Sequence, residues 1–445
     1  MFPKRFRAAK ASLAVVLAAV LAVGGLHGAQ AQSLLAVYDA AHAYDATYLA
    51  ARALAQSAEY RAAQVEALGR PTLSATAGAS TAQNDFPKIG SSDIAARQAT
   101  LNGRYPLFNR ANGAAIDQAR RQLDSAFADL DSAEQDLIVR AAQTYFDVLA
   151  AQDTLGTTRA NKAAITETLA SAKRNFEVGT ATITDTREAQ ARFDLATAQE
   201  IAADNDLLTK RIALDQLVGG TGLVPQSLRV PVVLPATVPA NAEEWVNVAD
   251  TQHPAVLRAR VALDVAKLET TKAKAAALPT LDAVAGLGVS YSRGITVALP
   301  GTTQSASLGV QMNWPLYTGG ATQNRIKETL LLEDKTRNDL DAARRGVAQG
   351  TRVAYFGVQS GEAQVKALEA AEASSKLALE ATQLGYKVGV RVNLDVLNAQ
   401  TQLFQTQRDL AKARYDVLVG SLKLRQASGR LTPEDLAATN RLLKP

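Results

Sequence analysis

Apolar and polar residues alternate in two stretches that are separated from each other by only a short loop. Every second residue from Leu281 to Tyr291 is apolar, and so is every second residue from Ala306 to Leu316. Small or polar residues occupy most of the positions between them. This period of two is typical of strands with one apolar face. Counting the corresponding stretches earlier in the chain, we predict four strands: 72–84, 95–107, 280–293 and 303–316.

A different period dominates two other long stretches. From Leu123 to Val148, apolar residues recur at a mean spacing of about 3.6 residues, which is the period of a nearly straight helix. No proline occurs from Leu107 to Val224 or from Leu316 to Thr432. Proline disrupts helix interiors, so its absence favours long helices in both stretches. A helix from about Arg110 to Phe176 would be ~100 Å long.

The chain contains a duplicated unit of roughly 210 residues. Pro71-Thr72-Leu73 recurs as Pro279-Thr280-Leu281, and Phe176-Glu177-Val178-Gly179 recurs as Tyr386-Lys387-Val388-Gly389. Each copy has a helix, two strands and a long helical hairpin in the same order. The resulting division is a signal peptide at 1–31, then a helix at 32–70, strands at 71–108, a hairpin at 109–220, a proline-rich connector at 221–252, a helix at 253–278, strands at 279–317, a hairpin at 318–428 and a C-terminal segment at 429–445.

The first residues have the composition of a secretory leader. Four basic residues precede an apolar run from Ala11 to Val23, and Ala29-Gln30-Ala31 fits a small-x-small cleavage site. The alternative, a transmembrane anchor, would need ~20 apolar residues, more than this run supplies. The leader also accounts for most of the net charge of +5. Without it the chain is close to neutral, which removes the main argument for nucleic-acid binding.

Candidate catalytic chemistry is sparse. The chain has no Cys and three widely separated His residues, His27, His42 and His253. Thiol catalysis, disulfides and thiolate metal sites are excluded, and no metal-binding or phosphate-binding motif is present. We therefore expect no enzymatic activity, no metal and no cofactor. Two classes of exported protein can be weighed at this point, a hydrolase and a soluble periplasmic coiled-coil adaptor. The hydrolase lacks candidate catalytic residues, and the adaptor does not explain the four alternating strands.

The strands themselves leave two interpretations open, an ordinary soluble sheet with one wet face and a membrane-spanning sheet. Their length suits a membrane, which needs ~9–11 residues per tilted strand. Tyr105, Trp314 and Tyr317 stand at predicted strand ends, where an interfacial aromatic girdle is expected. A lipid-exposed sheet cannot leave its edges unpaired. Since four strands are too few to close, a membrane barrel would require several chains.

The layout of the chain resembles the TolC family of outer-membrane channel proteins, especially the branch that serves type I secretion. The most specific stretches are Tyr386–Leu397 and Gly429–Leu436. The resemblance implies an α+β membrane protein that is a homotrimer, with a shared twelve-strand barrel in outer-membrane lipid and a helical tunnel crossing the periplasm. It also implies docking through a periplasmic adaptor onto an inner-membrane ABC transporter or proton-driven pump. Family members usually have Asp-Pro where this chain has Asp45-Ala46, whereas the second copy has His253-Pro254.

The resemblance also assigns roles at the two hairpin turns. Asp395 matches an acidic ring that faces the channel entrance, and Asn398 stands where many relatives have a second acid. Two further residues, Tyr386 and Arg391, match positions that tie the hairpins together when the channel is closed, with Asp185 and Thr184 as their partners. Simpler alternatives are that Asp395 only stabilises a helix N-terminus and that Tyr386 only packs within its hairpin.

The turns also contain the segments Val178-Gly179 and Val388-Gly389, which we expect at the distal tips, where an adaptor would dock. The two glycines fit helix C-terminal caps. The branch resemblance favours an exit duct for type I protein secretion. The alternative is the outer-membrane component of a small-molecule efflux pump, and the sequence does not identify the cargo.

Overall fold

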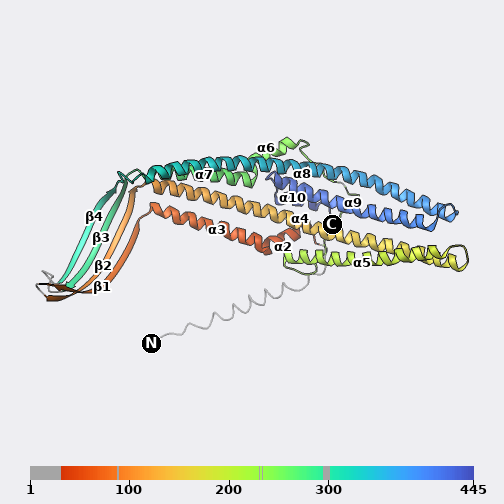
Figure 1. The fold of residues 1–445 in the computed structure, drawn as a ribbon, viewed down its shortest axis with the longest axis horizontal. Coiled ribbons are helices and arrows are strands. Elements are labelled where there is room, and N and C mark those ends of the chain that lie inside the picture. The colour runs from red at the N-terminus through yellow and green to blue at the C-terminus, as the bar shows by residue number, and fades with distance from the viewer. Residues whose placement is uncertain (1–31, 88–89, 230, 233, 294–300, 445) are drawn as a thin grey trace, which may run out of the picture.

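The computed structural model describes residues 32–87, 90–229, 231–232, 234–293 and 301–444. The predicted leader, 1–31, lies outside the described residues. The chain is elongated, with a curved sheet at one end and helices extending from it to two hairpin tips at the other (Figure 1). The elements are α2 (Leu34–Tyr44), α3 (Ala46–Glu66), η1 (Ala67–Gly69), β1 (Thr72–Phe86), β2 (Gly90–Phe108), α4 (Arg110–Glu177), α5 (Ile183–Val218), α6 (Ala242–Gln252), α7 (Pro254–Ala275), β3 (Thr280–Arg293), β4 (Gly301–Asn313), α8 (Ala321–Lys387), α9 (Asn393–Ala427) and α10 (Pro433–Asn440).

The four strands form one antiparallel sheet in the order β1-β2-β3-β4. The pairing of Leu101 with both Ala75 and Leu287 shows how the two copies of the repeat join through β2 and β3. Within the described part of the chain, β1 and β4 each have one edge without a partner strand. Such edges expose unpaired backbone amides and carbonyls, so the isolated sheet is incomplete.

The two faces of the sheet differ in chemistry, as the alternation predicts. One face is apolar and exposed: Leu308 is 87% exposed and Val310 64%. The opposite face is polar, and the hydroxyl oxygens of Thr76 and Thr100 lie 2.6 Å apart on it. Near the helices, that polar face also contains an ion pair in which an Arg104 guanidinium nitrogen lies 2.6 Å from a carboxylate oxygen of the buried Asp282.

The fourth strand is shorter than predicted. It ends at Asn313, whereas the alternation of apolar residues continues to Leu316. Pro315 has no backbone N–H to donate to the sheet, which explains why the ladder stops before it. Trp314 and Tyr317 therefore follow β4 instead of lying within it. A proline also disturbs the second strand, where the register shifts between Pro106 and Phe108.

The helices follow the same plan in both copies. The two longest, α4 with 68 residues and α8 with 67, extend ~100 Å from the sheet to the tips. Two shorter helices pack along each: α3 and α5 contact α4, while α7 and α9 contact α8. Each long helix is thus paired with one helix near the sheet and another near its tip (Figure 1).

A break that the periodicity does not predict interrupts the first helix. Asp45 separates α2 from α3 and caps α3, because its carboxylate accepts a hydrogen bond from the amide of Tyr48 at 2.7 Å. Arg140 of α4 donates to both carboxylate oxygens of Asp45, at 2.9 and 3.1 Å. In the second copy, His253 caps α7 by accepting from the amide of Ala255 at 3.1 Å. The unusual Asp45-Ala46 and the His253-Pro254 pair therefore both start a helix.

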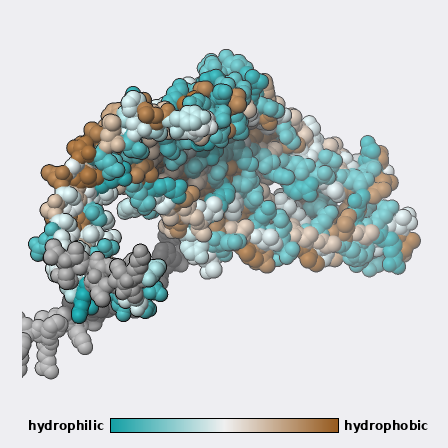
Figure 2. All heavy atoms as spheres, turned by 60° about the vertical axis from the view of Figure 1, so that its left-hand side comes forward, coloured by the Kyte–Doolittle hydropathy of each residue, from teal (hydrophilic) through white to brown (hydrophobic). Residues whose placement is uncertain are grey.

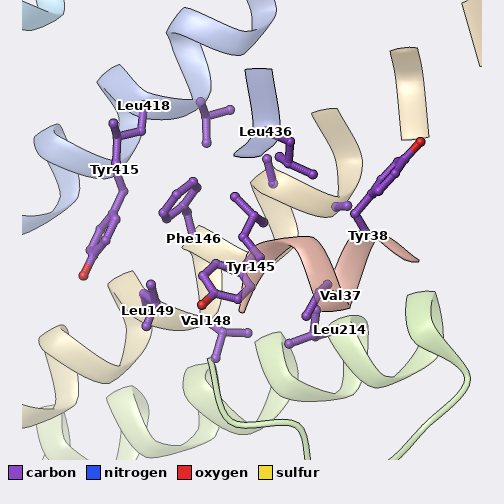
Figure 3. Packing of buried hydrophobic residues seen from close by; sticks show 14 of the residues in the cluster. Val37, Tyr38, Tyr145, Phe146, Val148, Leu149, Leu214, Tyr415, Leu418 and Leu436 are labelled. Atoms are coloured by element: carbon purple, nitrogen blue, oxygen red, sulfur yellow. The ribbon is translucent and has the colours of Figure 1, made fainter. Parts of the chain in front are cut away.

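The largest hydrophobic core lies midway along the helices, where α2, α4, α5, α9 and α10 meet (Figure 3). Tyr145 and Phe146 are fully buried there, and Phe146 stacks on Tyr415 with ring centroids 5.7 Å apart. The Tyr145 hydroxyl accepts the amide of Gln226 at 2.8 Å, which fastens the connector to α4. Tyr355 in the second copy donates to the carbonyl of Ala240 at 2.8 Å. The tyrosines are packing residues that also anchor the connector.

The connector and the C-terminal segment contain more regular structure than the proline pattern suggests. Helix α6 occupies the end of the 221–252 segment, and α10 lies in 429–445. Asn241 caps α6, while Thr432 and Asp435 form a capping box at the start of α10. Both short helices pack beside the middle of the long ones, and α6 contacts α7 and α8.

Candidate functional site at the hairpin tips

The two hairpin turns have the same backbone design. In the first, the carbonyl of Asn175 accepts the amides of Thr180 and Ala181, at 2.8 and 3.2 Å. In the second, the carbonyl of Gly385 accepts the amides of Val390 and Arg391, at 2.9 and 3.2 Å. Each turn also contains a glycine with positive φ two residues after the last helical residue, at Gly179 (76°) and Gly389 (80°). A left-handed residue after a helix favours glycine, so the two predicted caps have a physical basis.

The turns differ in how the returning helix starts. At α5, Thr182 accepts the amide of Asp185, and Asp185 accepts from both the amide and the hydroxyl of Thr182, at 3.0 and 2.7 Å. The corresponding residue before α9 is Val392, which has no side-chain oxygen and caps nothing. Asp395 therefore takes no part in a capping box. Its carboxylate lies 3.6 Å from a guanidinium nitrogen of Arg391 instead.

A glycine makes room for this ion pair. A Cβ added at Gly385 would lie 2.8 Å from Cγ of Arg391, so the arginine side chain passes directly over the end of α8. Among the described contacts within the chain, neither Tyr386 nor Arg391 bonds to Asp185 or Thr184. The Tyr386 side chain is half-buried, which is compatible with packing in its own hairpin and with a bond to another molecule.

A contact that the sequence did not reveal joins the two hairpins. Arg192 of α5 donates a hydrogen bond to the side-chain oxygen of Asn398 of α9 at 2.8 Å. Asn398 is exposed and Arg192 is half-buried, and Arg192 has no carboxylate partner among the described residues. One turn after Asp395, where many relatives have a second acid, each chain thus has the neutral amide of Asn398. This amide accepts a hydrogen bond from Arg192, whose positive charge is not balanced by a described carboxylate. The two residues are 206 positions apart, and no local signal links them. Because the repeat offset is about 210, Asn398 corresponds to Glu188 of the first copy, which lies one helical turn before Arg192.

The tips are apolar at their ends. Val178 is 73% exposed and Val390 is 75% exposed, and the flanking Val388 and Val392 are exposed as well. Exposed apolar groups that cluster at the end of a helical hairpin are candidates for contact with another protein.

At the opposite end of the molecule, exposed aromatic residues surround the junction between sheet and helices. Tyr105, Trp314 and Tyr317 are all exposed, Tyr317 to 86%. Figure 2 shows hydrophobic side chains gathered around the bend where the sheet meets the helices, while hydrophilic ones cover much of the helical part. Aromatic rings beside an exposed apolar sheet face are typical of a membrane interface.

The described residues contain no group of three or more His, Asp or Glu side chains placed to hold a metal ion. None of the helices among them has both the length and the apolar composition that crossing a membrane requires.

The chain matches the sequence profile of the outer membrane efflux protein family twice, over residues 37–220 and 245–430. These two ranges correspond to the two copies of the repeat.

The chain belongs to the outer membrane efflux protein family.

Relatives of known name agree with this assignment. The chain is 32% identical to outer membrane protein TolC of Vibrio cholerae, over 93% of this chain and 94% of the relative. It is 33% identical to the alkaline protease secretion protein AprF of Pseudomonas aeruginosa, over 80% and 74%. The fold matches a crystal structure of CusC with a TM-score of 0.79 at 18% identity, over 90% and 92% of the two chains.

Membership in the family confirms several expectations from the sequence. The resemblance to TolC and the fold of long helical hairpins with four antiparallel strands are both confirmed. The protein is an outer-membrane protein that extends into the periplasm, and it acts in efflux or secretion as a transport protein, not as an enzyme.

Proposed function

We propose that three copies of this chain form the outer-membrane exit duct of a tripartite export system. The observation that carries this proposal is a four-stranded sheet with two unpaired edges and one exposed apolar face. Pairing β4 of one protomer with β1 of the next removes every edge, as lipid requires. Two copies would give eight strands, which leave an interior filled with side chains, whereas three give twelve and a pore.

The apolar face has the height that the membrane demands. From Leu281 to Tyr291 it extends ten residues along β3, or ~34 Å at the rise of a strand. Strands in such barrels tilt by ~35–45°, so the projected height is ~25 Å, equal to the apolar band of outer-membrane barrels. Tyr105, Trp314 and Tyr317 then lie at the inner margin of this band, and the polar face lines the lumen.

The hairpin tips form the periplasmic entrance in this proposal. Three Asp395 carboxylates face the axis, each beside its own Arg391. Tyr386 and Arg391 hold the closed state by bonding to Asp185 and Thr184 of a neighbouring protomer. The intramolecular contacts are compatible with such a clamp, since the Tyr386 hydroxyl has no hydrogen bond within the described chain. The first carboxylate oxygen of Asp185, Oδ1, is not used by the capping box, which engages Oδ2.

We further propose that the apolar tips around Val178-Gly179 and Val388-Gly389 dock onto a periplasmic adaptor that connects the duct to an inner-membrane transporter. The likeness to AprF, a protease secretion protein, supports type I protein secretion with an ABC transporter. The family description, outer membrane efflux protein, favours small-molecule efflux with a proton-driven pump as the second candidate. The division of the chain into a leader cut after Ala31 and eight mature segments is part of this proposal.

Oligomeric state and insertion test the proposal together. Detergent-purified protein should have the mass of three chains, and the same preparation should form ion-conducting pores in planar bilayers. A monomer that inserts stably into lipid would refute the shared barrel.

Orientation is tested separately by Ser91→Cys, which should react with an impermeant thiol reagent on intact cells because no native Cys competes. Thr182→Cys at the first hairpin tip is the matched control and should react only after the outer membrane is permeabilised. The reverse pattern of labelling would mean that the sheet and the tips have exchanged sides.

A further inference from the structure

The outer end of the apolar sheet face contains two arginines. Register places Arg97 of β2 directly opposite Tyr291 of β3, and it pairs Arg293 of β3 with Ala95 of β2. Strand residues two apart share a face, so Arg97 and Arg293 lie on the same face as Leu101, Leu287 and the other apolar residues. Diagonal neighbours in a sheet have Cα atoms ~7–8 Å apart, close enough for both guanidiniums to reach one ligand.

Neither arginine has a structural role that the described part of the chain shows. Both side chains are exposed, and neither forms an ion pair or hydrogen bond with any described residue. Arg104 provides a contrast, because it lies on the opposite, polar face of β2 and is bound to Asp282. The nearest carboxylate on the apolar face, Asp93, is paired in register with Gln83, one row further from the membrane, and makes no ion pair with either arginine.

The position of the pair along the sheet indicates its ligand. In the proposed barrel the apolar band ends at the row that contains Tyr291 and Arg97, and Arg293 lies one row beyond it. Basic side chains are tolerated on a lipid-facing surface only near its margins, where they can extend into the headgroup layer. Since β1 and β3 lead away from the periplasmic helices, this margin belongs to the outer leaflet.

We propose that Arg97 and Arg293 form a binding site for the phosphate groups of outer-leaflet lipid, one site on each protomer; this rests on the proposed trimeric barrel. Guanidinium groups bind phosphate oxygens through paired, charge-assisted hydrogen bonds. Tyr291, between the two arginines on the same face, covers the sugar or glycerol part of the headgroup with its ring. The lipid thereby fixes the depth of the barrel in the membrane.

Native mass spectrometry of the delipidated full-length trimer tests the site. Diphosphoryl lipid A is titrated into the wild type and into Arg97→Gln/Arg293→Gln, with dephosphorylated lipid A and millimolar inorganic phosphate as separate arms. We expect the double variant to bind ~10-fold less diphosphoryl lipid A than the wild type, and the wild type to discriminate against the dephosphorylated lipid. The matched control Arg104→Gln, on the lumen face, should bind as the wild type does.

Equal lipid binding by the wild type and the double variant would overturn the inference. Full competition by inorganic phosphate would overturn the assignment to lipid and leave a site for the free anion. If the double variant does not assemble, single Arg97→Gln should still reduce binding about threefold, and Arg97→Lys should weaken it less, because lysine keeps the charge but loses the paired hydrogen bonds. A wild type that forms no trimer before any lipid is added would instead contradict the proposed function.

Discussion

Charge at the hairpin tips gives a quantitative test of the proposed entrance. In each chain Arg192 donates to Asn398 at 2.8 Å, and Arg391 lies 3.6 Å from Asp395. These four side chains sum to +1, since Asp395 contributes −1 and each arginine +1. Asn398→Asp reduces the sum to zero by adding a negative charge, and Arg192→Gln does so by removing a positive charge. We therefore expect both substitutions to shift the channel toward cations by the same amount.

The size of the shift follows from Coulomb's law. A unit charge ~10 Å from the axis changes the energy of a monovalent ion there by ~0.4 kcal/mol in water. Screening reduces this to ~0.3 kcal/mol at 0.01 M salt and ~0.1 kcal/mol at 0.15 M. For the three charges of a trimer the total is ~0.9 kcal/mol at low salt. That energy corresponds to a change of about fourfold to fivefold in local cation concentration, falling to about twofold at 0.15 M.

Reversal potentials in planar bilayers under a potassium chloride gradient measure this selectivity. The two single variants should give equal shifts, the double variant Asn398→Asp/Arg192→Gln about twice the shift, and all shifts should diminish as salt rises. Arg192→Lys is the control, because it keeps the charge while removing the planar guanidinium. If Asn398→Asp shifted the reversal potential and Arg192→Gln did not, Arg192 would lie outside the field of the entrance and the charge balance above would be wrong.

Three further predictions concern the tips and the helix break. Tyr386→Phe combined with Arg391→Ser should raise single-channel conductance in intact trimers, because it removes the proposed clamp; unchanged conductance would leave Tyr386 as a packing residue. Asp395→Ala should shift selectivity toward anions and weaken block by multivalent cations, with little change in conductance at high salt; unaltered block would place Asp395 away from the axis. Asp45→Asn should lower the free energy of unfolding by about 2 kcal/mol, because the neutral amide still caps the helix but loses the ion pair between the buried Asp45 carboxylate and the partly exposed Arg140.

The effect of Asp45 should depend on pH in a defined direction. Burial alone would raise the pKa of the Asp45 carboxyl, but the hydrogen bonds from Arg140 and from the amide of Tyr48 hold it below its usual value. The folded state therefore favours the charged form, and its contribution to stability is present above the ordinary Asp pKa of ~3.9. That contribution is lost as pH falls through the lowered pKa. Denaturant unfolding of the wild type and Asp45→Asn should converge in acid; a constant difference down to pH 2 would contradict this account.

Some differences between expectation and structure had a signal in the sequence. Pro315 marks the end of β4, and the Thr432-Pro433 pair followed by Asp435 has the pattern of a capped helix start, which is α10. Asp45 had a weaker signal. Aspartate is a common cap, but whether it interrupts a helix depends on a partner, and Arg140 lies 95 residues away along the chain.

The apolar stripe of α4 shows why burial could not be predicted along its whole length. Leu137 and Tyr145 are fully buried within the chain, whereas Phe127, on the same predicted stripe, is 44% exposed. In the second copy Tyr355 is buried, but its neighbour Phe356 is 56% exposed. A periodic pattern identifies a face that will be covered, but it does not say whether the same chain or another copy covers it.

The sequence by itself determined the type of each long element, the duplication and the backbone of both tips, because these depend on residues close together in the chain. Alternation over two residues defines the strands, proline-free periodicity defines the long helices, and the glycines after α4 and α8 define the turns. The sequence also determined that Asp395 forms no capping box, because Val392 precedes α9 at the position where Thr182 precedes α5. Only the tertiary structure decided that Arg192 meets Asn398 and that Arg97 shares a face with Arg293. Those contacts depend on how helices rotate about their axes and on the register between strands, and residues far apart in the chain set both.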